Sequence, residues 1–322
     1  MNAPKRLKLE TPTKPTLTPI LADELYKELP LIDVYVGKIK DPKTTSKVVV
    51  ELNSVLPIPE LTHLKRVRGK EILLFPKGDN DEDDCLTVLK QKGFDVDLIE
   101  SQVRVIAVAE IPPKVRKQYE VVHKLWPCNF HSNAYWEKLS TNSLFSDSEL
   151  EQHAKFMRIA IDICDICSVR VSAVVVDPVI TSVVGFGFDQ TSDYPTKHAV
   201  MVAIDEVARS QKGGVWPRHQ NYDKIQSLLK MKHENLQFGF STSGEGPYLC
   251  TGYSVYTTCE PCITCAMALV HSRAKRVFYG VKSEKGALGS SCKIHIVENL
   301  NHHYEAFAGL LETECRAVSC EQ

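Results

Sequence analysis

The first hundred or so residues contain short apolar runs that alternate between strand-like and helix-like spacing. Leu31–Ile39 and Val103–Glu110 are rich in β-branched and apolar residues, which predicts two strands. Between them, the pattern predicts two helices and a hairpin whose turn contains Gly69. These inner elements are a short helix or helix-like connector at Thr45–Asn53, hairpin strands at His63–Val67 and Glu71–Phe75 joined across Arg68–Lys70, and a helix at Asp84–Lys92 closed by Gly93.

The resulting order, β-α-β-β-α-β, predicts a small α+β domain over residues 20–110. This order is that of ferredoxin-like and RNA-recognition-like domains. The aromatic signature that lets an RNA-recognition sheet stack bases is missing. We therefore expect the topology of such a domain without base stacking on its sheet.

The flanking segments have different compositions. Residues 1–19 hold four prolines among lysines and threonines and predict a disordered basic tail. Pro4–Glu10 within it is a basic cluster of the nuclear-import type, although a solvated tail explains it equally well. Residues 111–147 are interpreted as an ordered linker, because Trp126 and Trp136 would be unusual in free solution.

Residues 148–322 repeat the alternation of strands and helices on a larger scale. A helix capped by Asp147 or Ser148 reaches Ile166 with apolar residues on one face. The pattern as a whole predicts an α/β domain with a mixed sheet covered by helices. The further elements are strands at Val171–Val176 and Val183–Phe188, a helix at 198–209, a strand at Ser254–Thr257, a helix at 262–271, a strand at Arg276–Val281 and a terminal helix from about Asn301 to Arg316.

Composition narrows the range of partners and compartments. The chain has 322 residues, 43% of them apolar, which is enough for two cores. A net charge of −1 gives no global basic field, so any nucleic-acid surface must be local. No apolar run approaches the length of a membrane span, and no signal-peptide core is present, so no membrane association is expected. The grouping of the eleven cysteines favours metal binding in a reducing compartment over disulfides.

Three residues whose side chains bind zinc occur at a characteristic spacing. Cys262 and Cys265 form a C-x-x-C pair preceded by Pro261, and His198 begins an upstream helix. Two cysteines on the first turn of a helix can both reach one ion, and the helix N-terminus favours their thiolate form. Nucleobase deaminases use the pattern H-x-E followed by P-C-x-x-C, in which the Glu transfers protons. Here Val200 stands at the Glu position, so the pattern predicts a zinc site that lacks its catalytic base.

Other readings of these residues are open. His198 alone would be an ordinary capping or core histidine, and only its combination with the C-x-x-C pair favours a metal. Cys259 stands three residues before Cys262, but we expect it in the turn that precedes the helix, beside the ligands and not among them. Cys164 and Cys167 share the spacing without a histidine, which predicts buried thiols on a helix face.

A family resemblance rests on three segments. They are Lys197-His198-Ala199-Val200-Met201, the run from Thr258-Cys259-Glu260-Pro261-Cys262 through Cys265 to Arg273, and Asn299–Tyr304 followed by Leu310-Leu311-Glu312. With these segments the chain resembles the non-catalytic subunits of eukaryotic heterodimeric tRNA adenosine deaminases, which make inosine at the wobble position of the anticodon. The resemblance covers most of the chain.

The resemblance implies a cytidine-deaminase-like fold, Zn²⁺ held by His198, Cys262 and Cys265, and no catalytic residue in this chain. It implies a catalytic partner subunit that supplies the Glu, tRNA as the bound nucleic acid, and a nuclear and cytoplasmic location. Heterodimer contacts are expected on the helices bearing His198 and Cys262 and at Asn301–Tyr304. The 64-residue spacing from position 198 to position 262 is longer than in single-chain tRNA deaminases. Roughly residues 211–250 therefore form an insertion, and Gly213, Gly214 and Gly244 fit a loop there.

The missing base leaves two alternative functions to consider, and it leaves the fourth zinc ligand unassigned. Asp205 or Glu206 could replace the Glu, but Glu206 is eight residues from His198, about 12 Å along a helix at 1.5 Å per residue, and a proton shuttle must approach to about 3 Å. A zinc-stabilised RNA-binding adaptor with no deaminase role is the other alternative. A fourth zinc ligand could come from the C-terminus, as Cys320 or the carboxylate of Gln322.

Candidate RNA contacts are basic residues near the hairpin and in the linker. Clustering against a nearly neutral background favours a phosphate-binding role for the group, whereas any single residue could be an ordinary surface charge. The set is Lys65, Arg66, Arg68 and Lys70 at the hairpin, with Lys114, Arg116 and Lys117 in the linker.

Overall fold

The computed structural model describes residues 15–78, 84–241 and 248–320, and it divides the chain into two compact units. The first unit is Asp23–Thr141. The second begins at Asn142 and also includes residues 15–22. The structure therefore assigns most of the expected linker, up to position 141, to the first unit. The basic cluster Pro4–Glu10 lies outside the described residues.

The first unit confirms the order β-α-β-β-α-β. Its four-stranded sheet has the order β3-β4-β2-β5, and every neighbouring pair is antiparallel. This arrangement is the ferredoxin-like one. Its strands are β2 (Leu31–Lys38), β3 (Val67–Arg68), β4 (Glu71–Pro76) and β5 (Arg104–Ala109), and its helices are α1 (Thr45–Val55), α2 (Cys85–Gln91), α3 (Arg116–Leu125) and α4 (Ala134–Ser140).

The hairpin is shorter than predicted. Strand β3 holds only two residues, where the sequence pattern predicted a strand from His63 to Val67. The chain before it pairs elsewhere, because Leu64 forms a bridge with Cys128 and the Lys65 N–H donates to the Pro127 carbonyl at 2.9 Å. A local pattern could not reveal these partners, which lie more than sixty residues further along the chain.

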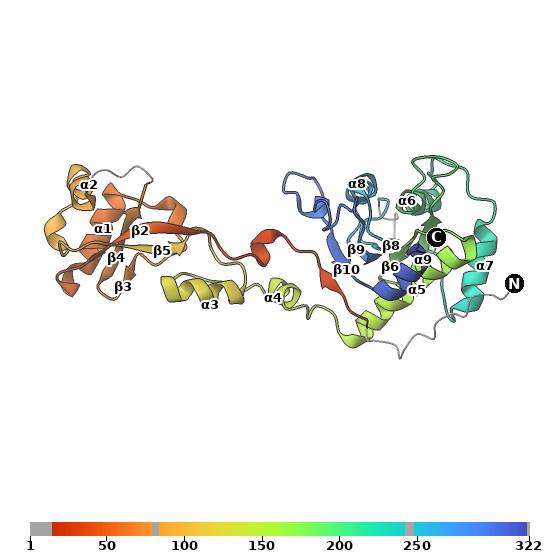
Figure 1. Ribbon diagram of the computed structural model, residues 1–322, viewed down its shortest axis with the longest axis horizontal. Helices are drawn as coiled ribbons and strands as arrows, with labels where there is room; N and C mark the ends of the chain where they lie inside the picture. Colours follow the sequence, from red (N-terminus) through yellow and green to blue (C-terminus); the bar gives the residue numbers. More distant parts are fainter. Residues whose placement is uncertain (1–14, 79–83, 242–247, 321–322) are drawn as a thin grey trace. The chain divides into compact units, whose positions relative to one another are not determined.

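Helix α3 closes one face of this sheet (Figure 1). Helices α1 and α2 pack on the other face, against residues such as Ile72 and Leu74. On the α3 side, Val34, Val36 and Val108 pack against Val122 and Trp126. Trp126 is fully buried, and its indole N–H donates to the Lys65 carbonyl. The face on which an RNA-recognition domain stacks bases is therefore filled by the chain's own side chains.

The second unit contains the mixed sheet predicted for the larger domain. The strand order is β1-β10-β9-β8-β6-β7, in which β8, β9 and β10 run parallel and the other neighbouring pairs are antiparallel. The strands are β1 (Thr18–Pro19), β6 (Ser172–Asp177), β7 (Ser182–Phe188), β8 (Ser254–Cys259), β9 (Arg276–Val281) and β10 (Glu305–Ala308). The helices are α5 (Asp147–Cys167), α6 (Ala199–Ser210), α7 (Tyr222–Lys232), α8 (Ile263–His271) and α9 (Glu312–Cys320).

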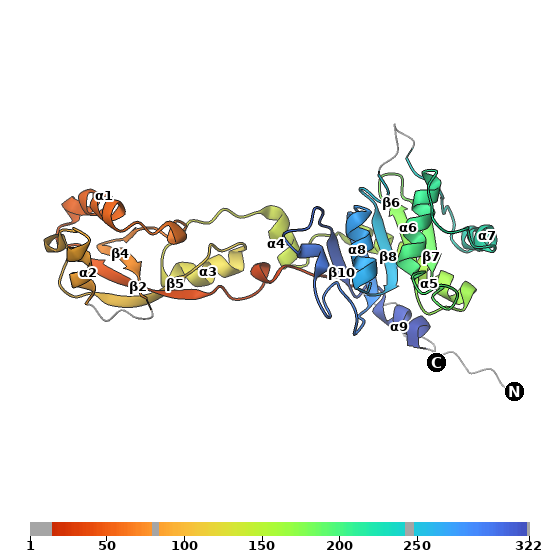
Figure 2. The same ribbon diagram turned by 90° about the horizontal axis from the view of Figure 1, so that it is seen from above.

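Helices cover both faces of this sheet, with α6 and α8 on one side and α5 and α9 on the other (Figures 1 and 2). Helix α6 lies very close to β7. A Cβ added at Gly187 would lie 2.5 Å from both the Ala199 carbonyl oxygen and the Ala203 nitrogen, so only glycine permits this approach. Helix α5 starts with a capping box, in which the Ser146 side chain accepts the Glu149 N–H and the Glu149 carboxylate accepts the Ser146 N–H. The cap is thus one residue before Asp147 and two before Ser148, the two predicted caps.

Two predictions about the ends of the chain are wrong. The segment Asn301–Arg316 is not one helix: Glu305–Ala308 form the inner strand β10, and α9 begins at Glu312. The tail predicted to be disordered over residues 1–19 is partly ordered, because Leu17 is buried and β1 pairs with β10. The insertion at 211–250 also holds a helix, α7, where only a loop was predicted; Gly244 lies outside the described residues.

Candidate metal centre

The three predicted zinc ligands lie together where α6 and α8 begin. His198 is the N-cap of α6, Cys262 is the N-cap of α8, and Cys265 lies within the first turn of α8. One ligand atom from each lies within 4.8 Å of the others. Cys262 Sγ lies 3.7 Å from His198 Nδ1. Two helices that pack on the same sheet face (Figure 2) therefore bring together residues 64 positions apart.

The electrostatics of the pair favour metal binding. A hydrogen bond from the Cys265 thiol, together with backbone N–H groups of Cys265 and Thr264, lowers the pKa of Cys262 to about 5 in spite of its partial burial. The same side-chain hydrogen bond, and then burial, raise the pKa of Cys265. A thiolate at a helix N-terminus beside an imidazole nitrogen and a second sulfur is a donor set that fits zinc.

Val200 lies directly beside these ligands. It is 3% exposed and belongs to the apolar cluster between α6, α8 and the sheet. Together with His198, Cys262 and Cys265 it lines a cavity of about 250 Å³. Val200 therefore presents an isopropyl group beside the candidate ligands, and an isopropyl group cannot transfer a proton.

The acids near this cavity have other partners. Asp189 accepts a hydrogen bond from the Thr191 hydroxyl at 2.9 Å. Glu260 is 4% exposed, and its carboxylate accepts N–H bonds from Ser283, Leu288 and Ser290 at 2.9–3.1 Å, as well as the Ser290 hydroxyl. Glu260 thereby fixes the loop after β9, which bridges to Cys262 at Gly286. The sequence contains this Glu in the cysteine motif, but only the structure reveals its role.

The two acids considered as replacement bases are also engaged. Glu206 forms ion pairs with Arg209 and Arg218, at 3.3 and 2.9 Å. Asp205 pairs with Arg209 and accepts the Val215 N–H at 2.6 Å. Both carboxylates therefore hold the beginning of the insertion against α6. The geometry gives neither of them the role of a base at the metal site.

The remaining cysteines do not join the ligand group. Cys259 lines the cavity, but within the described residues the cluster of possible metal ligands contains only His198, Cys262 and Cys265. Cys164 is buried near the Thr258 hydroxyl, and burial raises the pKa of Cys167 to about 11, so both favour the thiol form. The Cys320 side chain and Gln322, the suggested sources of a fourth ligand, lie outside the described residues.

The seven basic residues proposed for RNA contacts fall into two groups. Lys65, Lys70, Arg116 and Lys117 are exposed, whereas Arg66, Arg68 and Lys114 are partly buried. Arg68 donates to Glu71 at 2.8 Å and to the Leu125 carbonyl at 2.8 Å, and its guanidinium lies 4.3 Å from the Trp126 ring centroid. Arg68 thus holds α3 against the sheet. Clustering along the sequence did not distinguish it from the exposed lysines on either side.

Comparison with known proteins first defines the class. Residues 150–281 match the family described as cytidine and deoxycytidylate deaminase zinc-binding region. Residues 32–126 match the family described as tRNA-specific adenosine deaminase TAD3 N-terminal domain. The second unit is therefore a cytidine-deaminase-like domain, as the motifs predicted.

Whole-chain relatives then define the family. The chain is 33% identical to the "probable inactive tRNA-specific adenosine deaminase-like protein 3" of Danio rerio, over 94% of each chain. It is 33% identical to the human protein of the same name, over 92% of this chain and 90% of the relative. The tRNA-specific adenosine deaminase TAD3 of Arabidopsis thaliana is 26% identical over 94% of this chain and 95% of its own. The chain belongs to this TAD3 family of tRNA-specific adenosine deaminase proteins, which confirms the resemblance.

Across the described residues, none of the helices has both the length and the apolar character needed to cross a membrane.

Proposed function

We propose that the chain is the non-catalytic subunit of a heterodimeric tRNA-specific adenosine deaminase that converts the wobble adenosine of anticodons to inosine. One observation carries the proposal: three side chains that can bind zinc meet in one cavity beside Val200, which cannot transfer a proton. The names of the relatives support it, since vertebrate members are called inactive and the Schizosaccharomyces pombe relative is called a subunit of the deaminase.

In this proposal, His198, Cys262 and Cys265 hold Zn²⁺. When bound, zinc in this class activates water for attack on the base, but without a Glu the ion in this subunit serves the fold. The ion would join the first turns of two helices that are far apart in the sequence. Purified full-length chain should contain about one zinc per chain, and Cys262→Ala should lower this ratio to near zero. Cys164→Ala, which removes a buried thiol outside the ligand set, is the matched control; full metal in Cys262→Ala would contradict the assignment.

The catalytic subunit is the proposed partner, contacting α6, α8 and the segment Asn301–Tyr304. The proposed location is the nucleus and cytoplasm. The inosine content of tRNA after incubation with this chain, with a Glu-bearing catalytic subunit, and with both, tests the function. We expect inosine only when both are present. Inosine made by this chain alone would refute the proposal, and failure to stimulate or bind the catalytic subunit would favour the adaptor alternative.

The exposed cations of the first unit are the proposed tRNA contacts. Lys65 and Lys70 flank the hairpin, and Arg116 and Lys117 begin α3. Because phosphate contacts release counterions, the affinity for tRNA should fall steeply with salt and depend little on sequence. Arg66 and Arg68 have protein partners and contribute less to this surface than their sequence position suggested.

A further inference from the structure

Two neighbouring helices of the second unit, α6 and α8, end with the same backbone pattern. The residue after each C-cap has the left-handed conformation: Lys212 after α6, with φ 67°, and Arg273 after α8, with φ 59°. In each case the N–H of the following residue donates to the carbonyl five positions earlier, at 2.8 and 3.1 Å. Glycine is the usual residue at such a position. The helix dipole favours a cation there, but a cation in the last helical turn would benefit from it without the strained backbone.

The segment 248–250 joins these two helix ends. Its middle residue, Leu249, exchanges two backbone hydrogen bonds with the Gln211 side chain at the end of α6, at 2.9 and 3.0 Å. The N–H of the following residue donates to the carbonyl of Ser272, the C-cap of α8, at 2.8 Å. The segment thereby holds Tyr248 beside both helix ends.

The exposed side chains at these helix ends are mostly positive. Lys212, Arg273 and Lys275 are exposed, and within the described residues none of the three pairs with a carboxylate. The Arg273 guanidinium lies 5.2 Å from the ring centroid of Tyr248, a residue that is 60% exposed. With the exposed His271 these residues form what we call the helix-end surface. No acidic residue lies within two sequence positions of any of the five.

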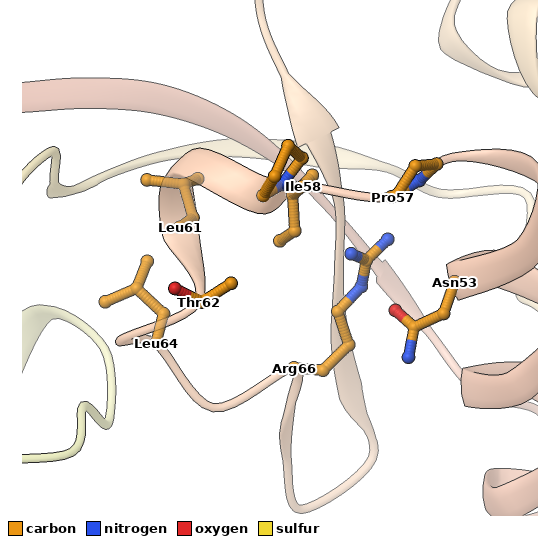
Figure 3. A pocket seen from close by; sticks show the side chains of 8 residues that line it. Asn53, Pro57, Ile58, Leu61, Thr62, Leu64 and Arg66 are labelled. Carbon is orange, nitrogen blue, oxygen red and sulfur yellow. The ribbon is translucent and has the colours of Figure 1, made fainter.

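Other cations of the chain are bound to partners within the protein. Arg66 lines a cavity of about 320 Å³ in the first unit (Figure 3). Its Nη2 donates to the Leu56 and Leu74 carbonyls at 3.0 and 2.8 Å, so it links α1 to β4. Arg276, next to the helix-end surface, pairs with Glu305 at 2.7 Å. The cations of the helix-end surface differ from these because no described carboxylate neutralises them.

A nucleic-acid strand has the chemistry that this surface can bind. Lysine and arginine side chains contact phosphates, and an exposed tyrosine ring offers a face on which a base stacks. The guanidinium beside that ring contributes a cation–π contact and a positive charge together. A protein partner would need a cluster of apolar side chains at the centre of its interface, whereas this surface has one aromatic ring among cations.

We propose that the helix-end surface binds a single strand of RNA, with phosphates at Lys212, Arg273 and Lys275 and a base stacked on Tyr248. The choice of RNA over DNA, and of tRNA in particular, rests on the proposed function. The surface is separate from the candidate metal centre, because the zinc ligands lie where α6 and α8 begin. Helix α6 has 12 residues, which separates its two ends by about 18 Å at 1.5 Å per residue.

The test uses the full-length chain and fluorescence anisotropy with a labelled oligouridine and with whole tRNA. Arg273→Glu with Lys275→Glu should weaken binding of both RNAs at least about fivefold. The log–log salt slope for oligouridine should fall by about 1.4, since each phosphate contact on a single strand contributes about 0.7. Lys224→Glu with Lys230→Glu is the matched control, because these exposed lysines of α7 change the net charge equally outside the surface. It should leave the affinity and the slope at their wild-type values.

Tyr248→Ala separates stacking from charge. It should weaken oligouridine binding at least about fivefold and leave the salt slope unchanged, and Tyr248→Phe should retain the affinity. Arg273→Gly controls for folding, because glycine adopts the left-handed conformation without strain. This variant should weaken RNA binding without lowering the urea midpoint, so a folding defect would not explain its weaker binding.

Equal affinities in the wild-type chain and the Arg273→Glu, Lys275→Glu variant would overturn the proposal, as would an equal loss in the α7 control. A variant that keeps its RNA affinity and loses binding to a catalytic deaminase subunit would identify a protein interface, which also overturns it. RNA affinity is measured without the catalytic subunit, so the two proposals can fail separately. RNA binding at this surface in a chain that supports no inosine formation would refute only the proposed function. Inosine formation with unchanged RNA affinity in the variants would refute only this proposal.

Discussion

Gly286→Ala tests the role assigned to Glu260. A Cβ at position 286 would lie 2.5 Å from Glu260 Oε1 and closer still to the other atoms of that carboxylate. Normal contacts of a Cβ are at least 3.4 Å, so the carboxylate would have to move by about an ångström. Its N–H bonds from Leu288, Ser290 and Ser283, now 2.9–3.1 Å, would then lengthen beyond hydrogen-bonding range.

The cost can be estimated from these bonds. A hydrogen bond to a charged group contributes about 1.5–3 kcal/mol, and losing at least two of these three around a buried carboxylate predicts a loss of about 3–6 kcal/mol in the free energy of unfolding. The loop that bridges to Cys262 should loosen as well, so zinc content should fall. Urea denaturation followed by circular dichroism, together with metal analysis, measures both effects.

Gly213→Ala is the matched control for this substitution. A Cβ at Gly213 would approach its nearest atom, the Ala208 carbonyl oxygen, only to 3.2 Å, and the backbone there is not in the left-handed region. We expect a loss of less than about 1 kcal/mol, typical of a tight but adjustable contact. If Gly286→Ala destabilises the chain no more than Gly213→Ala, the role given to Glu260 is wrong.

Three further predictions follow. Val200→Glu should bind zinc yet form no inosine without the catalytic subunit, and it should lose about 1–3 kcal/mol of stability from the buried acid; inosine formation by this variant alone would contradict the proposed function. Burial, with a smaller effect of Arg276, lowers the pKa of His153 from 6.5 to about 4. The buried neutral imidazole therefore contributes fully to the free energy of unfolding above pH 6.5, and this contribution is lost as the pH falls toward 4. Denaturation should show a loss of about 2 kcal/mol between pH 7 and pH 5 that His153→Phe reduces, and an unchanged pH profile in the variant would refute this. Lys65→Glu with Lys117→Glu should weaken tRNA binding and flatten its log–log salt dependence by about two in slope, whereas an unaltered slope would exclude these residues as phosphate contacts.

The sequence predicts that the three candidate zinc ligands lie together, and the structure places them so because their signals are local. The C-x-x-C spacing places both sulfurs on one helical turn, and the strand and helix order brings His198 to the same sheet face. The segment Asn301–Arg316 failed for the opposite reason. Glu305–Ala308 are a strand because they lie between β9 and β1, and one of these partners is nearly three hundred residues away. No short-range pattern contains that information.

The basic residues illustrate the same limit at the level of side chains. Arg68 and Lys70 are two positions apart, yet Arg68 is held by Glu71 and by the carbonyl of Leu125, a distant helix end, while Lys70 is exposed. Helix α3 explains the difference. Val122 and Trp126, spaced by four, face the sheet, while Gln118, four positions before Val122, donates to the Glu24 and Lys27 carbonyls; this spacing was visible in the sequence. The sequence did not show which surface these residues cover.

Each unit has the fold that surrounds a potential functional surface, and apolar side chains fill that surface. In the second unit, the isopropyl group of Val200 lines the same cavity as the three candidate zinc ligands. In the first, Val122 and Trp126 cover the sheet face on which a related domain would stack bases. An apolar group at such a position cannot react with or bind a polar substrate, but it adds packing that a solvated site would forgo. Under the proposed function, metal binding would therefore act on the stability of the second unit, and contacts with nucleic acid in the first unit would depend on groups away from the closed face, such as the exposed lysines.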